Sequence, residues 1–189
     1  EAYLSALEHD ADGTEIRNLV EALTTHTTSF FREARQYDWL AGPGLAMLTG
    51  AQTGRPLTVW SAACSLGAEL WSAGIVLSES AAAPRDWWLI GSDISTRVLR
   101  RAEAATFSED ELDGLSPARR TRYLLRARRL RDAGGRPIYR VAPDLRQRAR
   151  FLQANLHAMD TVQSFTADIV FLRDVLIYFD PAAQTRAVD

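Results

Sequence analysis

The stretch that decides the fold reads LTVWSAACSLG, from Leu57 to Gly67. Its first half is rich in β-branched and aromatic residues, and it breaks at a glycine-containing turn that passes into a helix-like segment. Some 26 positions after Gly67, a second apolar run, residues 87–92, ends on Asp93. In an open parallel sheet the carboxyl ends of neighbouring strands bind nucleotide-like ligands, and an acidic side chain there accepts hydrogen bonds from ribose hydroxyls. The two segments therefore predict a site for a nucleoside-containing cofactor.

The rest of the chain continues an α/β alternation around these two runs. Apolar and β-branched runs predict four strands, at residues 58–64, 87–92, 149–154 and 167–172. Helical patterns follow near residues 69–77, near residues 96–105 and from Pro181 onward. Asp180 supplies an N-cap for the last of these helices, and Pro181 stands at its first position.

Two parts of the chain lie outside this alternation. The first is an insertion at about residues 107–147, in which residues 109–112 and 116–130 have helical patterns and the run 137–141 indicates a β-hairpin at the end. The second is the N-terminal part, where residues 3–23 have the spacing of the end of one helix and the whole of a second. A further helical pattern runs from Phe30 to Leu48.

Composition narrows the class of protein. The 189 residues are 47% hydrophobic and 24% charged, with a formal net charge of −2 and a pI near 6.0. These values are ordinary for a soluble domain and argue against nucleic acid as the main partner. No apolar run approaches the roughly 20 residues that cross a bilayer, and no leader opens the chain. We therefore expect a cytoplasmic protein without direct membrane insertion.

Arginine, cysteine and histidine set further limits. All 22 basic residues are arginine, and they cluster at residues 119–120, 126–131 and 146–150. A locally basic binding face and an ordinary solvated helix face both remain open for these clusters. Cys64 is the only cysteine, so no internal disulfide can form, and we interpret it as a small buried strand residue, not a nucleophile. The three histidines are scattered without metal-ligand spacing, so no metal site is expected.

Four blocks of sequence together resemble the chemotaxis receptor glutamate O-methyltransferases, the CheR family. They read LTTHTTSFFRE at residues 23–33, VWSAACSLGAE at 59–69, SDI at 92–94 and FLRDVLIYFD at 171–180. Their order and spacing match those of the family across nearly the whole chain.

The resemblance implies an α/β fold of the Rossmann-like class I SAM-dependent methyltransferases, with a remnant N-terminal helical part and a small β-subdomain insertion. It divides the chain into residues 1–35, the end of an N-terminal helical subdomain with a cofactor-contacting linker, and residues 36–189, the SAM-binding α/β domain. Because the family continues through a helix and two more strands, we expect the C-terminal strands to be missing from this chain.

The resemblance also implies an activity. Members of the family use S-adenosyl-L-methionine to methylate glutamate side chains on chemoreceptors, and they release S-adenosylhomocysteine. A chemoreceptor is therefore the expected partner, while the oligomeric state stays open. The positions that match the family's cofactor contacts are His26, Thr28, Arg32, Glu69, Asp93, Asn155, Leu156, Arg173 and Asp174. Arg32 and Tyr178 are the candidate catalytic residues, because a guanidinium and a phenol can hold and orient an acceptor carboxylate.

Most of these residues also have an ordinary structural interpretation. Asp93 could cap the following helix instead of binding ribose, and Asn155 could be a strand-end turn residue instead of pairing with adenine. Arg32 could be a surface arginine, and Glu69 could merely favour the first turn of its helix. Tyr178 could be a core aromatic.

The matching blocks contain four departures from the family pattern. They are His26 for Asn, Ala68 for Glu, Leu70-Trp71 for Pro-Tyr, and Asp174 for Asn. Asp174 matters most, because an ionised carboxylate only accepts hydrogen bonds whereas an amide also donates them. It favours the cofactor's ammonium or sulfonium group and repels its carboxylate.

These departures leave three readings to weigh. The preferred one is a protein-glutamate methyltransferase, and the second is a divergent, weakly active or inactive CheR-like domain that serves as a regulatory or binding module. A third is a methyltransferase for another substrate. A dinucleotide-dependent dehydrogenase is disfavoured because the turn at residues 65–67 lacks the glycines that a pyrophosphate needs.

Overall fold

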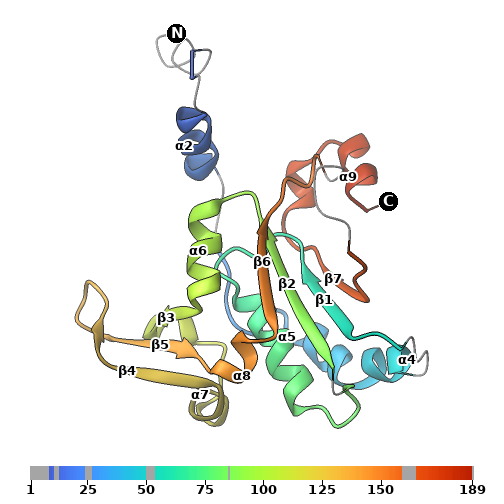
Figure 1. The fold of residues 1–189 in the computed structure, drawn as a ribbon, viewed down its shortest axis with the longest axis vertical. Coiled ribbons are helices and arrows are strands. Elements are labelled where there is room, and N and C mark those ends of the chain that lie inside the picture. The colour runs from blue at the N-terminus through green and yellow to red at the C-terminus, as the bar shows by residue number, and fades with distance from the viewer. Residues whose placement is uncertain are drawn as a thin grey trace.

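The computed structural model describes residues 9–10, 13–23, 27–49, 54–84, 86–158 and 165–188. Figure 1 shows a main body built on one parallel sheet, with a smaller sheet beside it and the N-terminal helix α2 projecting from the body. His26 and the expected first helix before residue 9 lie outside the described residues. Among the described residues, no helix has both the length and the apolar character needed to cross a membrane.

In the part of the chain that the structure describes, the main sheet contains four parallel strands in the order β6-β2-β1-β7. They are β1 (Leu57–Ser61), β2 (Trp87–Asp93), β6 (Ala149–Gln153) and β7 (Ile169–Phe171). Val59 of β1 lies between Leu89 of β2 and Ile169 of β7. The four strands lie where the sequence predicts them, although β1 ends at Ser61, three residues earlier than expected, and β7 is also shorter than expected. This topology brings the carboxyl ends of four separate segments to one edge of the sheet (Figure 1).

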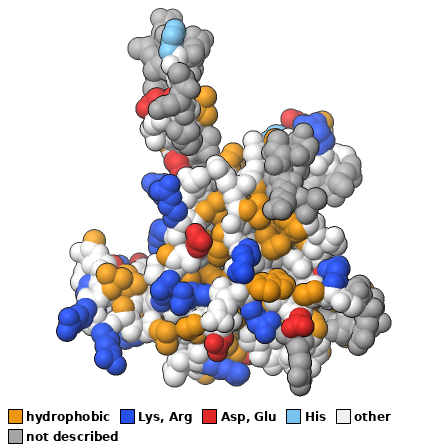
Figure 2. Space-filling view, viewed as in Figure 1, with side chains coloured by type: hydrophobic (Ala, Val, Ile, Leu, Met, Phe, Trp, Pro, Cys, Tyr) orange, Lys and Arg blue, Asp and Glu red, His pale blue; other side chains and the backbone are white. Residues whose placement is uncertain are grey.

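Two helices follow the central strands and contribute buried side chains to the core. Helix α5 (Ala68–Glu79) packs on β1 and β2, and α6 (Thr96–Ala104) packs on β2 and β6. Nearly all of α5 is buried, which agrees with its almost continuous apolar sequence. Side chains alternate along β1, with Val59 fully buried and Trp60 partly exposed. Figure 2 shows apolar side chains gathered over the strands on the side facing the viewer.

Within the described residues, the N-terminal part contains α2 (Thr14–Leu23), α3 (Ala34–Trp39), a π-helical turn η1 (Leu40–Gly44) and α4 (Leu45–Thr49). The helix predicted from Phe30 starts only at Ala34, so the expectation is wrong for its first four residues. Phe31 and Glu33 have φ values of 52° and 57°, which are left-handed and cannot belong to an α-helix. Helix α2 contacts the start of α6 through Glu21, whose carboxylate accepts a hydrogen bond from Ser95 Oγ at 2.6 Å.

The insertion forms a small antiparallel sheet in the order β3-β5-β4. It contains β3 (Thr106–Ser108), the 3-10 helix η2 (Glu109–Leu112), α7 (Pro117–Tyr123), β4 (Leu124–Arg131) and β5 (Pro137–Val141), and α8 (Pro143–Arg146) then leads back to β6. The helix expected at residues 116–130 is therefore wrong beyond Tyr123. Arginine and leucine favour helices locally, but pairing of β4 with β5 overrides that preference, and this non-local partner is not visible in the local pattern.

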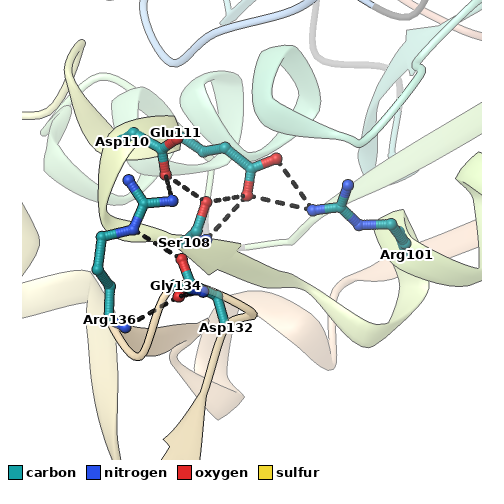
Figure 3. Close-up of polar contacts among 7 residues, drawn as sticks. All are labelled: Arg101, Ser108, Asp110, Glu111, Asp132, Gly134 and Arg136. Carbon is teal, nitrogen blue, oxygen red and sulfur yellow. Dashed lines mark hydrogen bonds and ion pairs between the residues drawn. The ribbon is translucent and has the colours of Figure 1, made fainter.

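Ion pairs on the outside of the small sheet fasten its turns, as Figure 3 shows. Arg136 Nε donates to Asp132 Oδ2 at 2.8 Å across the β4–β5 turn, and Arg136 Nη2 lies 3.4 Å from Asp110. Glu111 accepts from the backbone N–H of Ser108 at 2.8 Å, closing a capping box, and from Arg101 of α6 at 2.9 Å. The pKa values of Asp110 and Asp132 are lowered chiefly by hydrogen bonds, from the Ser108 side chain and from backbone N–H groups respectively.

The last described segment contains the 3-10 helix η4 (Leu176–Tyr178) and the helix α9 (Pro181–Val188). The predicted cap is confirmed, because Asp180 Oδ1 accepts a hydrogen bond from the backbone N–H of Ala183 at 2.9 Å. Backbone N–H donors at the helix start also lower the pKa of Asp180.

Candidate cofactor site at the carboxyl edge of the sheet

A cavity of about 420 Å³ opens at the carboxyl ends of the main strands. Its walls come from the loops after β1, β2, β6 and β7, from the segment before α3, and from η4. The lining residues are Thr27, Thr28, Arg32, Ala62, Ala63, Cys64, Ser65, Glu69, Asp93, Ile94, Ala154, Asn155, Leu156, His157, Arg173, Asp174, Val175, Tyr178 and Phe179. A cavity of this volume is in the range of small-molecule sites.

Asp93 is a buried acidic group of the cavity that is held by two backbone hydrogen bonds. It ends β2 and is 7% exposed. Its Oδ2 accepts from the backbone N–H of Ser65 at 2.9 Å, and its Oδ1 accepts from the backbone N–H of Ser95 at 3.0 Å. The capping alternative for Asp93 is wrong, because Ser95 is the N-cap of α6 and its hydroxyl accepts from the Val98 N–H. Each carboxylate oxygen retains a free lone-pair direction for a ligand hydroxyl.

Glu69 and Arg173 form the buried centre of the cavity. Glu69 is the second residue of α5, and its carboxylate accepts from Ser61 Oγ at 2.8 Å and lies 2.9 Å from Arg173 Nε. The Arg173 N–H is not aligned for a hydrogen bond along this contact, so the pair is held by charge. Burial raises the pKa of Glu69, while Ser61 and Arg173 act against that rise. Burial of the neighbouring Tyr37 hydroxyl, together with the negative charge of Glu69, raises the pKa of Tyr37.

Arg32 and Asp174 form a second, more exposed pair at the rim. Arg32 Nη2 lies 3.1 Å from Asp174 Oδ2, and Arg32 Nη1 donates to the Thr27 carbonyl oxygen at 3.3 Å. Arg173 Nη1 in turn donates to the Arg32 carbonyl oxygen at 2.9 Å. Asp174 has a left-handed φ of 56°, a conformation that Asp and Asn tolerate better than most residues. The guanidinium of Arg32 therefore already has a carboxylate partner within the protein.

The opposite wall combines a turn with apolar surface. Asn155 Oδ1 accepts from the backbone N–H of His157 at 3.0 Å, so the turn interpretation of Asn155 is confirmed, while its amide nitrogen can still serve as a donor. Leu156 is 8% exposed and presents an apolar wall. The rings of His157 and Phe179 lie with their centroids 4.1 Å apart, and Tyr178 is 69% exposed at the rim. Tyr178 is therefore not a core aromatic.

Cys64 faces the cavity from a buried position. Its side chain is 1% exposed, and burial together with the charge of Asp93 raises the pKa of its thiol. A thiol with a raised pKa is a poor nucleophile, which agrees with the expected buried and unreactive residue. Its expected place in a strand is wrong, because β1 ends at Ser61 and Cys64 lies in the loop that follows.

Every predicted site residue that the structure describes lines this single cavity: Thr28, Arg32, Glu69, Asp93, Asn155, Leu156, Arg173, Asp174 and Tyr178. His26 cannot be placed. The sequence reasoning missed Ser65, His157 and Phe179. His157 follows Leu156 and Phe179 follows Tyr178 directly, so adjacency to predicted residues was the available signal for these two. For Ser65 the available signal was its place in the turn of the family-like block at residues 59–69.

The residues fit a nucleoside-containing methionine cofactor. Asp93 offers carboxylate acceptors for ribose hydroxyls, and Leu156 with Asn155 offers an apolar wall beside an amide for a base. Glu69 and Asp174 suit an ammonium group, and Arg32 suits a carboxylate. The cavity thus contains a complementary group for each part of S-adenosylmethionine.

Comparison with known proteins gives the same assignment. Residues 26–189 match the family described as CheR methyltransferase, SAM binding domain. A chemotaxis protein methyltransferase of Klebsiella aerogenes is 36% identical over 188 residues, covering 97% of this chain and 60% of the relative. Chemotaxis protein methyltransferase 2 of Vibrio cholerae is 33% identical over 192 residues, covering 99% of this chain and 64% of the relative. The chemotaxis protein methyltransferase of Escherichia coli is 33% identical over 183 residues, covering 96% of this chain and 60% of the relative.

The chain thus spans about three fifths of the length of the curated relatives it matches. The matched region contains the parallel sheet and the whole carboxyl-edge cavity, and the description of the matching family makes S-adenosylmethionine the cofactor of that region. On its fold, its cavity and these matches, the chain belongs to the CheR methyltransferase family and contains that family's SAM-binding domain.

Proposed function

We propose that this chain transfers the methyl group of S-adenosylmethionine to glutamate carboxylates of a chemoreceptor in the cytoplasm. The observation that carries the proposal is the convergence of family-like blocks, far apart in the sequence, on one cavity at the carboxyl edge of the sheet. The printed names of the matched relatives, chemotaxis protein methyltransferases, support the same substrate class. The division into residues 1–35 and 36–189 is part of this proposal.

Each part of the cofactor has a proposed partner. Asp93 accepts hydrogen bonds from the ribose hydroxyls, while Asn155 and Leu156 hold the adenine edge and face. Glu69 attracts the ammonium group, Asp174 lies beside the methionine part as the partner of Arg32, and Thr28 and Arg173 complete the wall around that part. His26 is assigned to the same group by its position in the sequence alone.

Arg32 and Tyr178 are the proposed catalytic residues. Arg32 lies at the rim, where a guanidinium can hold the carboxylate of an incoming glutamate, and the exposed Tyr178 can orient it with a hydrogen bond. Bound S-adenosylmethionine supplies a methyl group that joins a glutamate oxygen while the electron pair of the broken S–C bond stays on sulfur, giving a methyl ester and S-adenosylhomocysteine. The reacting carboxylate has a reference pKa of about 4.3, so no general base is required. The residues act by positioning and electrostatics.

The first test is a calorimetric titration of S-adenosylhomocysteine into the purified chain. We expect binding in the micromolar range for the wild type and loss of binding for Asp93→Ala. Asp144→Ala is the matched control, because Asp144 is an exposed carboxylate of α8 away from the cavity. Thermal melts of all three proteins must show that they are folded, since Asp93 also holds two backbone N–H groups.

A second measurement addresses the reaction. The chain is incubated with methyl-labelled cofactor and a chemoreceptor fragment, and base-labile label on the receptor identifies glutamyl methyl esters. Folded wild-type protein that binds no S-adenosylhomocysteine would contradict the enzyme reading. Binding without methyl transfer would favour the regulatory module instead.

A further inference from the structure

The turn formed by residues 30–33 is shared between two cavities. On one side Arg32 lines the cofactor cavity. On the other side Phe31 lines a second cavity of about 440 Å³, together with Glu79, Gly114 and Arg119. The backbone is left-handed at Phe31 and at Glu33, and neither residue is glycine. Because an L-residue rarely adopts this conformation, the turn must be held in place by its surroundings.

The main domain supplies two hydrogen bonds to the turn. The backbone N–H of Phe31 donates to Ser72 Oγ of α5 at 3.0 Å, and Arg173 Nη1 donates to the Arg32 carbonyl oxygen at 2.9 Å. These bonds fix the backbone on the side of α5 and of the cofactor cavity. They leave the ring of Phe31 to be held by other groups.

Residues of the insertion also pack against the turn at residues 30–33. The ring of Phe107 on β3 contacts the ring of Phe30 edge to face, with centroids 4.8 Å apart. At Gly114 the chain approaches so closely that a Cβ would overlap the carbonyl oxygen of Phe30. The insertion therefore touches the backbone of the turn directly, and only glycine permits that approach.

Arg119 of α7 makes the most specific of these contacts. The central carbon of its guanidinium lies 4.1 Å from the centroid of the Phe31 ring. The same guanidinium is held by Glu79 at the end of α5, with Nε 3.1 Å and Nη2 2.7 Å from Glu79 Oε2. A forked cation that is fixed by a carboxylate and stacked on a ring is a rigid clamp. The second cavity gives Phe31 room to move when this clamp is removed.

We propose that Arg119 is a positioning residue of the methyltransferase site, which acts through Phe31 to hold Arg32 in the cofactor cavity. The small sheet is then a supporting wall of the site and not an independent appendage. The kinetic part of this inference rests on the proposed function, because it takes Arg32 as a residue of the reaction. The structural part, that Arg119 holds the turn at residues 30–33, does not depend on the proposed function.

Hydrogen exchange tests the structural part without any activity. We compare the exchange rate of the Phe31 amide in the wild type, in Arg119→Ala and in Arg119→Lys. Loss of the clamp should speed exchange about tenfold in Arg119→Ala and less in Arg119→Lys, which keeps the charge but not the fork. Arg129→Ala, an exposed arginine of β4, is the matched control and should exchange like the wild type. Unchanged exchange in Arg119→Ala would overturn the proposal.

A double-mutant cycle tests the kinetic part. Arg119→Ala should lower kcat/KM for the receptor acceptor about tenfold in the wild-type background and have no further effect in an Arg32→Ala background. A residue that only stabilises the fold would lower the rate by the same factor in both backgrounds, and that result would contradict the proposal. If the wild type itself transfers no methyl group, the proposed function fails, while the exchange experiment still decides whether Arg119 holds the turn.

Discussion

The cofactor cavity and the small sheet both use arginine–carboxylate pairs, but the pairs differ in their contact with water. In the cavity, the side chains of Arg173 and Glu69 are 14% and 10% exposed, whereas those of Arg136 and Asp110 in the small sheet are 50% and 58% exposed. Charges removed from water are costly unless each keeps its partner, while exposed charges keep much of their hydration. The same residue types therefore orient groups in the cavity and merely fasten a turn in the small sheet.

Removal of one partner should have its largest effect in the cavity. Arg173→Ala leaves Glu69 buried without its counter-charge, so we expect a loss of about 3–5 kcal/mol in the free energy of unfolding. Arg101→Ala, which breaks the exposed pair with Glu111, should cost less than about 1 kcal/mol. Urea unfolding measures both values. Losses of equal size would show that burial does not separate the two regions.

The rim of the cavity should respond in ligand affinity more than in stability. Asp174→Asn removes the partner of Arg32 and one negative charge, so the guanidinium becomes available to a ligand carboxylate. We expect S-adenosylhomocysteine to bind about three- to tenfold more tightly, with little change in stability because the pair is exposed. The asparagine should tolerate the left-handed backbone at this position. Weaker binding in calorimetry would mean that the carboxylate of Asp174 serves the ligand's ammonium group.

Lowering the pH should stabilise the folded state through Glu69 in the cavity and destabilise it through Asp132 in the small sheet. The pKa of Glu69 is raised by burial, so its contribution to stability is complete below the unfolded pKa and is lost as the pH rises through the folded value. The pKa of Asp132 is lowered by hydrogen bonds, so its contribution is present above the unfolded value of 3.8 and is lost as the pH falls through the folded value.

Denaturant unfolding at a series of pH values measures this difference against two non-titrating variants. As the pH falls from neutrality, the wild type should gain stability relative to Glu69→Gln. Below the unfolded pKa of the aspartate it should lose stability relative to Asp132→Asn. Parallel pH profiles for the two variants would rule out the opposite shifts.

The smallest expected effect is that of salt on the melting temperatures of variants in the two regions. About 1 M NaCl shortens the screening length to roughly 3 Å and weakens exposed pairs far more than buried ones. The difference in melting temperature between the wild type and Arg101→Ala should therefore shrink in salt, while the difference between the wild type and Arg173→Ala should persist. A salt-sensitive Arg173 variant would place its ion pair in contact with solvent.

The fold was predictable from the sequence where local pattern and final environment agree. Strands β1 and β2 are apolar runs that end at a turn and at Asp93, and they form the centre of the sheet as expected. The prediction was wrong for β4, because an arginine- and leucine-rich segment becomes a strand only through pairing with β5. It was also wrong at Phe31, whose left-handed backbone is imposed by tertiary contacts.

The composition of the site was more predictable than its internal contacts. The resemblance brought most of the polar lining residues into the prediction, and all predicted residues that the structure describes line the cavity. The pairing of Glu69 with Arg173 was not foreseen, since the two residues are far apart in the chain and compatible with several partners. The pairing of Asp174 with Arg32 was not foreseen either. Asp174 replaces the asparagine of the family pattern, and its carboxylate already has a partner within the protein.

Asp93 carries a consequence for how this site can change over time. One carboxylate joins the loop after β1 to the start of α6 and also faces the cavity. A mutational screen for soluble protein and a screen for ligand binding would therefore both retain Asp93. No single replacement there can change ligand binding without also changing the fold. Drift toward a new ligand is easier at positions such as Asp174 or His157, whose side-chain contacts, with Arg32 and with Phe179, lie at the wall of the cavity and hold no backbone N–H group of the core. The strand-tip carboxylate should thus be the last part of the cavity to diverge, even in a descendant that no longer performs catalysis.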